Sequence, residues 1–192
     1  AGYSNFRSSV KYFLFRTAFG LLVIASANPQ YGENEKTVES KGIDIMIALD
    51  ISRSMMAEDI VNNYSRLDLA KLAIGKLMNE LRGDHVGIVV FAGEAYKQLP
   101  LTPDYHVAKL FLKSIGTDMI SSQGTAIDEA IQLATNYYDD ESKIERILII
   151  ISDGEDHNDV SVDMAKIASE KGIIIYTIGV GKEKGAPIPI KK

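Results

Sequence analysis

The polar residues Asp50, Ser52 and Ser54 alternate along the chain directly after an apolar run. In extended backbone, alternate side chains point to the same side, so one carboxylate and two hydroxyls would face one point. Such hard oxygen ligands suit Mg²⁺ or Mn²⁺ rather than a softer metal. The sequence has no cysteine, which excludes zinc–thiolate sites, disulfides and thiol chemistry. The segment from Asp50 to Ser54 is therefore a candidate for half of a divalent-metal site.

Two further segments offer oxygen ligands that could complete this site. Asp153 follows the apolar run 146–151, and Thr125 ends the polar segment 121–125 ahead of a helical pattern. Magnesium favours six oxygens in an octahedron. Three hydroxyls, two carboxylates (direct or through water) and water would leave one coordination position open to an oxygen from another molecule. An ion with few directly bound anionic ligands stays electrophilic and would favour an outside carboxylate. The five residues therefore predict recognition of an Asp or Glu on a partner protein.

Each of these segments also has a simpler interpretation. Asp, Ser and Thr between a loop and a helix usually cap the helix, and for Thr125 alone capping is the favoured interpretation. The acidic run 153–159 lacks the spacing and terminal Glu of an EF-hand loop, so apart from Asp153 it is interpreted as a solvated loop. Three oxygen-bearing segments, two of them directly after predicted strands, support a metal site better than any one alone.

The elements that must position these residues alternate along the chain. Apolar runs predict strands, and apolar residues at helical spacing predict helices between them. Pro103 is expected to start the second helix, with Asp104 in its first turn. The strands are expected at 43–49, 86–92, 95–99, 146–152 and 173–180, and the helices at 66–81, 103–115, 125–138 and 160–171. This order predicts an α/β fold with a mainly parallel, doubly wound sheet and helices on both faces, in which ligands bind beyond the carboxyl ends of the strands.

The first part of the chain has a different character. Residues 12–27 are apolar apart from Arg16, and residues 1–32 carry a charge of +3, whereas the rest carries −8. We predict a basic head and transmembrane helix in residues 1–29, a polar linker in 30–41 and the α/β domain in 42–192. A signal peptide and a buried amphipathic helix stay open as alternatives. The net charge of −5 argues against binding to nucleic acid.

The residues resemble a known family closely. Asp50, Ser52, Ser54, Thr125 and Asp153 match every position of the metal-ion-dependent adhesion site (MIDAS) of von Willebrand factor type A (VWA) domains. The segments DISRSMMA (50–57), FAGEA (91–95), LPLTPDY (99–105) and SDGED (152–156) are similar to the bacterial Bat aerotolerance proteins. The resemblance implies a Rossmann-like sheet whose antiparallel edge strand lies near 95–99. It also implies that the serines and the threonine touch the metal, while the aspartates often act through water.

The resemblance further implies a membrane-anchored interaction module. Sister Bat proteins and a MoxR-type AAA+ ATPase are the partners that it suggests. Because the basic residues precede the apolar run, the positive-inside rule places the domain on the periplasmic side of a bacterial inner membrane. The family continues beyond 185–189 into a further strand and helix, so we expect this chain to be a fragment truncated at its C-terminal end.

Three functions compete at this point. The leading hypothesis is a metal-dependent binding module that is not an enzyme. A Mg²⁺-dependent phosphoryl-transfer hydrolase could use Asp50 as its nucleophile, but Ser52 stands where an acid for the leaving group would be needed, and the sequence contains no G-x-x-x-x-G-K-[ST] loop. A scaffold with a vestigial site is the third possibility, and the intact set of five residues argues against it.

Overall fold

The computed structural model describes residues 3–26, 42–61, 63–122, 124–138, 144–154 and 160–182. The predicted linker at 30–41 and the acidic run beyond Gly154 lie outside these residues. Two units are distinguished, an N-terminal helix and an α/β unit that follows. Each is described by itself below.

The N-terminal unit is the helix α1, Tyr3–Ser26. It begins before the apolar run 12–27 that predicted it, because residues 3–11 are helical as well. The span from Phe6 to Ser26 contains an 18-residue window with a mean hydropathy of 1.3, and the helix is long and apolar enough to cross a membrane. Large apolar side chains of the helix are exposed, such as Phe15 (71% exposed) and Leu22 (67% exposed).

The α/β unit is built on one five-stranded sheet with the order β3-β2-β1-β4-β5. Strands β1, β2, β4 and β5 are parallel, and β3 pairs antiparallel with β2 at one edge. The strands are β1 (Asp44–Asp50), β2 (His85–Phe91), β3 (Ala95–Thr102), β4 (Arg146–Ser152) and β5 (Ile173–Gly179). This confirms the predicted fold class, including its antiparallel edge strand. β3 is longer than expected and contains Pro100, which an edge strand tolerates because one side of its backbone needs no partner.

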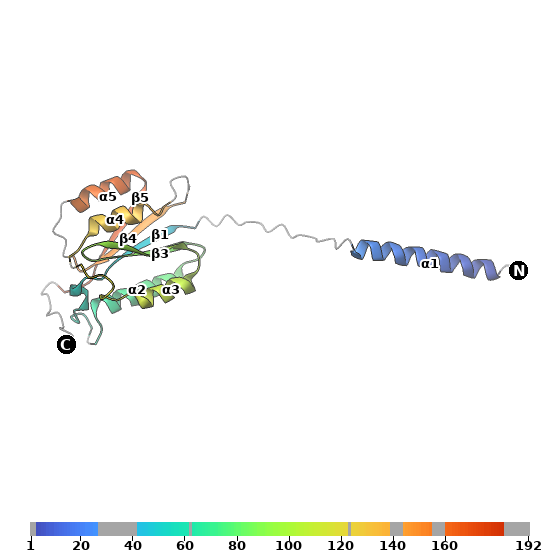
Figure 1. The fold of residues 1–192 in the computed structure, drawn as a ribbon, viewed down its shortest axis with the longest axis horizontal. Coiled ribbons are helices and arrows are strands. Elements are labelled where there is room, and N and C mark those ends of the chain that lie inside the picture. The colour runs from blue at the N-terminus through green and yellow to red at the C-terminus, as the bar shows by residue number, and fades with distance from the viewer. Residues whose placement is uncertain are drawn as a thin grey trace. The chain divides into compact units, whose positions relative to one another are not determined.

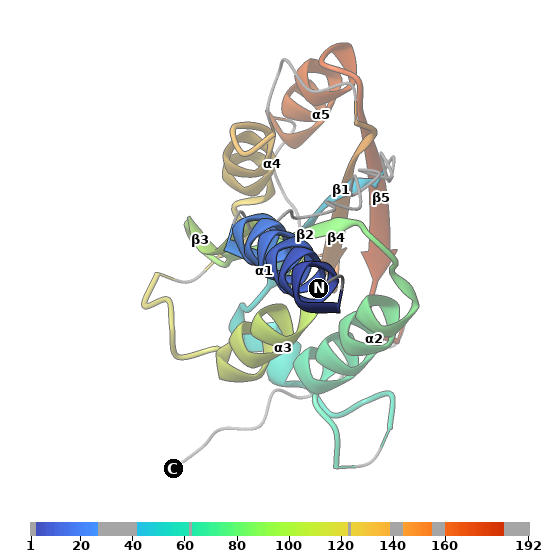
Figure 2. The same cartoon turned by 90° about the vertical axis from the view of Figure 1, so that its right-hand side faces the viewer.

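Helices cover the sheet on both faces, as Figures 1 and 2 show. Helices α2 (Arg66–Glu80) and α3 (Tyr105–Ser114) lie on one face, and α4 (Ile127–Thr135) and α5 (Val160–Glu170) on the other. The central strand β1 is buried along its whole length, which explains its continuous apolar sequence. Its Ile47 and Leu49 belong to the core under α2 and α3, whereas Met46 and Ala48 belong to the core under α4 and α5.

Two predicted helix starts were wrong. α3 begins at Tyr105, and Asp104 is its cap rather than part of its first turn: the carboxylate accepts hydrogen bonds from the backbone N–H groups of His106 and Val107, at 2.9 and 3.1 Å. α4 begins at Ile127 and not at Thr125. The N–H of Ala126 donates to the carbonyl of Ala92 at 2.6 Å, which ties this segment to the end of β2 before the helix can start.

Candidate metal centre

Asp50 ends the central strand, at the carboxyl edge of the parallel part of the sheet. Its side chain is fully buried, and both of its carboxylate oxygens accept a hydrogen bond. Oδ1 accepts from the backbone N–H of Ser52 at 2.8 Å, and Oδ2 accepts from the hydroxyl of Ser152 at 2.7 Å. Because Ser152 ends β4, this second bond joins the ends of two neighbouring strands.

Ser52 directly precedes the 3₁₀ helix η1, Arg53–Met56, and Ser54 is the second residue of that helix. Their hydroxyl oxygens lie 2.9 Å apart, and both residues are buried. The two hydroxyls lie together as predicted, but the predicted extended backbone was wrong, because a 3₁₀ helix begins at Arg53. The turn is tight because the N–H of Met55 donates to the Ser52 carbonyl at 3.1 Å and the N–H of Ala57 to the Ser54 carbonyl at 3.0 Å.

Asp153 directly follows β4, so its carboxylate enters the same edge of the sheet. Its side chain is 0% exposed, and Oδ2 accepts a hydrogen bond from Nη1 of Arg66 at 2.9 Å. The other oxygen, Oδ1, is buried and has no hydrogen-bond partner among the described residues. A buried carboxylate oxygen without a donor is unfavourable, so this atom is where a cation would be stabilising.

Thr125 is half-buried and is held at the same edge by its backbone neighbours. Besides the bond from Ala126 to Ala92, the N–H of Gly93 donates to the carbonyl of Ser122 at 3.2 Å. Both bonds fasten the segment to the residues that follow β2, the strand beside β1. The capping interpretation of Thr125 was wrong, because the residue before α4 is Ala126 and no side chain caps that helix. No hydrogen bond joins Thr125 to the other four candidates within the described part of the chain.

The electrostatics of this edge favour a bound cation. Burial raises the pKa of Asp50 above its ordinary value of 3.8, and the negative charge of Asp153 raises it further, while hydrogen bonds from Ser52 and Ser152 oppose the shift. The charge of Asp153 therefore disfavours the ionised form of Asp50. A divalent cation would remove that penalty.

Arg66 is the residue of this edge that sequence reasoning missed. It is the first residue of α2 and is only 7% exposed. Its guanidinium donates to Asp153 and also to both oxygens of Asp59, with Nε at 3.0 Å and Nη2 at 2.8 Å. These bonds lower the pKa of Asp59 to about 2. Arg66 stands 87 residues before Asp153, so no local spacing could have indicated the contact.

Within the described residues, no three His, Cys, Asp or Glu side chains form a group that could hold a metal ion. This fits a site that relies on hydroxyl oxygens, because such an ion would have only the two carboxylates Asp50 and Asp153 for charge. The assignment of the five residues as metal ligands stays a prediction.

Comparison with known proteins identifies the class to which this fold and its sheet edge belong. The von Willebrand factor type A domain family matches residues 45–155. The crystal structure of the conserved hypothetical protein BatB from Bacteroides thetaiotaomicron is similar, with 51% identity and a TM-score of 0.75 over 78% of this chain and 72% of that one. An aerotolerance-related membrane protein from Bacteroides fragilis has 47% identity and a TM-score of 0.74 over 78% and 73%. The chain therefore belongs to the von Willebrand factor type A family and, within it, to the Bat type.

More distant similarity is limited to the fold. Proximal thread matrix protein 1 from the mussel byssus, solved with zinc in its MIDAS motif, has 21% identity and a TM-score of 0.61 over 73% of this chain and 36% of that one. The chain spans about half, 52%, of the length of the curated bacterial relatives that it matches.

Proposed function

We propose that this domain binds a divalent cation, Mg²⁺ or alternatively Mn²⁺, at Asp50, Ser52, Ser54, Thr125 and Asp153, and uses it to bind a carboxylate of a partner protein. The observation that carries the proposal is Oδ1 of Asp153, which is buried and has no hydrogen-bond donor among the described residues. The paired hydroxyls of Ser52 and Ser54 supply two further oxygens at the same edge. The mussel protein with zinc in its MIDAS motif supports metal binding by analogy.

The five residues would have different roles at such a site. Ser52, Ser54 and Thr125 would contribute neutral oxygens, and Asp153 would contribute its free oxygen while Arg66 holds the other one in place. Asp50 already accepts from Ser52 and Ser152, so it would position the loop and balance the charge, reaching the ion through water. When bound, the cation would stay electrophilic, because only one of its direct ligands, the carboxylate of Asp153, carries a charge.

The same geometry favours a binding module over a hydrolase. A nucleophilic carboxylate must reach a substrate, but Asp50 is fully buried and both of its oxygens are held by hydrogen bonds. We therefore propose that the domain is not an enzyme. The intact oxygen set argues in turn against a scaffold with a vestigial site.

We further propose that α1 anchors the domain in the bacterial inner membrane, with the domain on the periplasmic side. Arg7, Lys11 and Arg16 belong to the first part of α1, and the positive-inside rule keeps that end in the cytoplasm. The similar proteins include one named as an aerotolerance-related membrane protein. We infer that the partners are sister Bat proteins and a MoxR-type AAA+ ATPase in an aerotolerance complex, one of which offers the Asp or Glu.

The test is calorimetric titration of the full chain in a nonionic detergent with MgCl₂ and MnCl₂. Wild type should show a single site, and the double variant Ser52→Ala/Ser54→Ala should lose it. Ser114→Ala, an exposed serine at the end of α3, is the matched control and should bind as wild type does. Equal affinity in the double variant and wild type would refute the site. Asp50-dependent release of phosphate from p-nitrophenyl phosphate would refute the binding-module proposal.

A further inference from the structure

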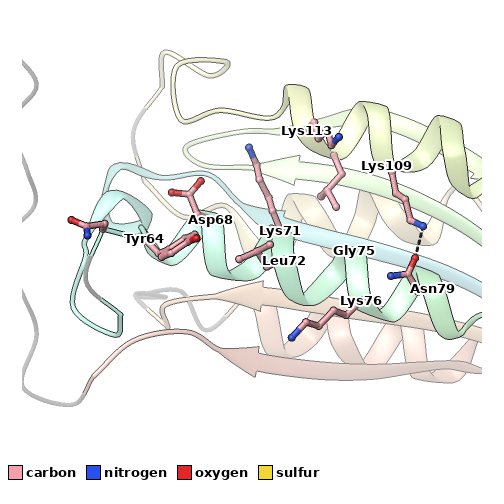
Figure 3. Close-up of a pocket in the computed structure, with 11 residues that line it drawn as sticks. Tyr64, Asp68, Lys71, Leu72, Gly75, Lys76, Asn79, Lys109 and Lys113 are labelled. Carbon is pink, nitrogen blue, oxygen red and sulfur yellow. Dashed lines mark hydrogen bonds between the residues drawn. The ribbon is translucent and has the colours of Figure 1, made fainter.

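A groove between α2 and α3 lies apart from the candidate metal centre. It has a volume of about 600 Å³, which is within the usual range of ligand sites, and none of the five candidate metal ligands lines it. Figure 3 shows its lining, with Lys71, Leu72 and Lys76 from α2 and Lys109 and Lys113 from α3.

The groove is strongly basic in an otherwise acidic protein. Four lysines line it, at positions 71, 76, 109 and 113, against a single acid, Asp68. The chain after residue 32 has a net charge of −8, so this concentration of positive charge is local. Asp68 is already engaged at the start of α2, where Oδ2 accepts from the hydroxyl of Ser65 at 2.6 Å and from its N–H at 3.2 Å.

None of the four lysines forms an ion pair with a described residue, although the negative charges of Asp68 and Asp118 act on Lys71. Lys71 donates to the backbone carbonyl of Ile115, and Lys109 donates to the side-chain oxygen of Asn79 at 2.5 Å. Both acceptors are uncharged. Lys76 and Lys113 are exposed and have no hydrogen bond or ion pair among the described residues. Like charges gathered this way are unfavourable until an anion binds between them.

The middle of the groove is apolar and open. Leu72 is 52% exposed, and Tyr64 near one end is 46% exposed. Gly75 has no side chain, and a Cβ placed there would meet nothing within 4 Å. Cationic groups therefore flank a surface that can accept an apolar side chain.

The length of the groove identifies the kind of occupant. From Asp68 to Asn79 the helix rises by roughly 16 Å at about 1.5 Å per residue. This distance matches about five residues of extended chain. A single phosphate or lipid headgroup would occupy only one end and would leave Leu72 uncovered.

We propose that the groove binds an acidic peptide segment of a partner protein, in which carboxylates alternate with an apolar side chain. The carboxylates pair with Lys76 and Lys113, and the apolar side chain covers Leu72 above Gly75. This interaction is separate from the proposed metal-dependent one, because no candidate metal ligand takes part in it. A partner held at both places would be bound more tightly than at either one.

The proposal is tested with the full chain in nonionic detergent micelles. The probe is a fluorescein-labelled peptide of three Glu-Glu-Leu repeats, followed by fluorescence anisotropy, beside a Gln-Gln-Leu peptide of the same length. The acidic peptide should bind saturably, should bind more weakly as NaCl is raised, and should bind equally with EDTA present. The Lys76→Glu/Lys113→Glu variant should lose about tenfold in affinity, because repulsion replaces two attractions.

The matched control is Lys166→Glu/Lys171→Glu, which makes the same charge change on the opposite face of the sheet, at Lys166 inside α5, where an exposed ion pair with Asp163 is lost, and at Lys171 just after α5. It should bind as wild type does. If the first variant fails to fold, Lys76→Gln/Lys113→Gln replaces it. The proposal would be overturned if the variant and the control lost affinity for the acidic peptide equally, or if the Gln-Gln-Leu peptide bound as well as the acidic one. It would also be overturned if glycerophosphoglycerol, the soluble headgroup of phosphatidylglycerol, displaced the acidic peptide. Loss of binding in EDTA would assign the peptide to the metal centre and would also overturn it.

Discussion

Arg66 provides the sharpest test of how the sheet edge is held together. Its guanidinium donates three hydrogen bonds to two carboxylates that are themselves almost inaccessible, with Asp59 4% and Asp153 0% exposed. Replacement by methionine fills much of the same space and removes the charge. Two ionised side chains then remain buried without their counter-ion.

The cost follows from the burial of these groups. Breaking a buried ion pair by removing one partner costs about 3–5 kcal/mol, because it leaves an uncompensated charge. At roughly 2–4 °C for each kcal/mol in a chain of this size, Arg66→Met should lower Tm by about 6–20 °C. The double variant Arg66→Met/Asp153→Asn should regain part of this loss, because the orphaned charge at position 153 is gone.

Thermal unfolding of the full chain in EDTA measures these differences, followed by the near-ultraviolet circular dichroism of its tyrosines. Arg53→Met is the matched control, because Arg53 lies beside the same loop but is exposed. It should shift stability by less than about 0.5 kcal/mol. A loss below about 1 kcal/mol in Arg66→Met, or a double variant no more stable than the single one, would refute the idea that Arg66 neutralises Asp153.

Two further predictions concern stability. Asp59→Asn should make Tm fall less steeply with pH in acid. The pKa of Asp59 in the folded protein is about 2, below its ordinary value of 3.8. The ionised pair with Arg66 therefore stabilises the fold above pH 3.8, and this stabilisation is lost as the pH falls to about 2. Parallel acid melting profiles of variant and wild type would contradict this. Gly42→Ala should destabilise by about 1–3 kcal/mol, because its Cβ would clash with the backbone carbonyl of Gly83. By contrast, Gly75→Ala in the open middle of α2 should stabilise by about 0.5–1 kcal/mol, as measured by Tm. Equal effects of the two glycine substitutions would contradict the packing argument.

The strand and helix pattern was largely readable from the sequence because burial repeats with the geometry of each element. β1 lies between β2 and β4 and under helices on both sides, so every residue from Asp44 to Asp50 is buried and the sequence shows one apolar run. The helix starts were harder to predict. Asp104 satisfies two backbone N–H groups as a cap, and Thr125 is followed by a backbone bond from Ala126 to Ala92 that no propensity encodes.

The sequence by itself predicted which oxygen-bearing residues could form the site, because the alternation of Asp50, Ser52 and Ser54 is a local pattern. Tertiary structure alone decided that Ser152 donates to one oxygen of Asp50 and that Arg66 donates to one oxygen of Asp153, whose other oxygen has no donor among the described residues. These contacts join residues 102 and 87 positions apart, and they exist because parallel strands deliver their carboxyl ends to one edge while α2 starts beside it. The residues that could hold a cation were therefore visible in the chain, whereas the buried charge that would require one appears only when the strands and α2 pack together.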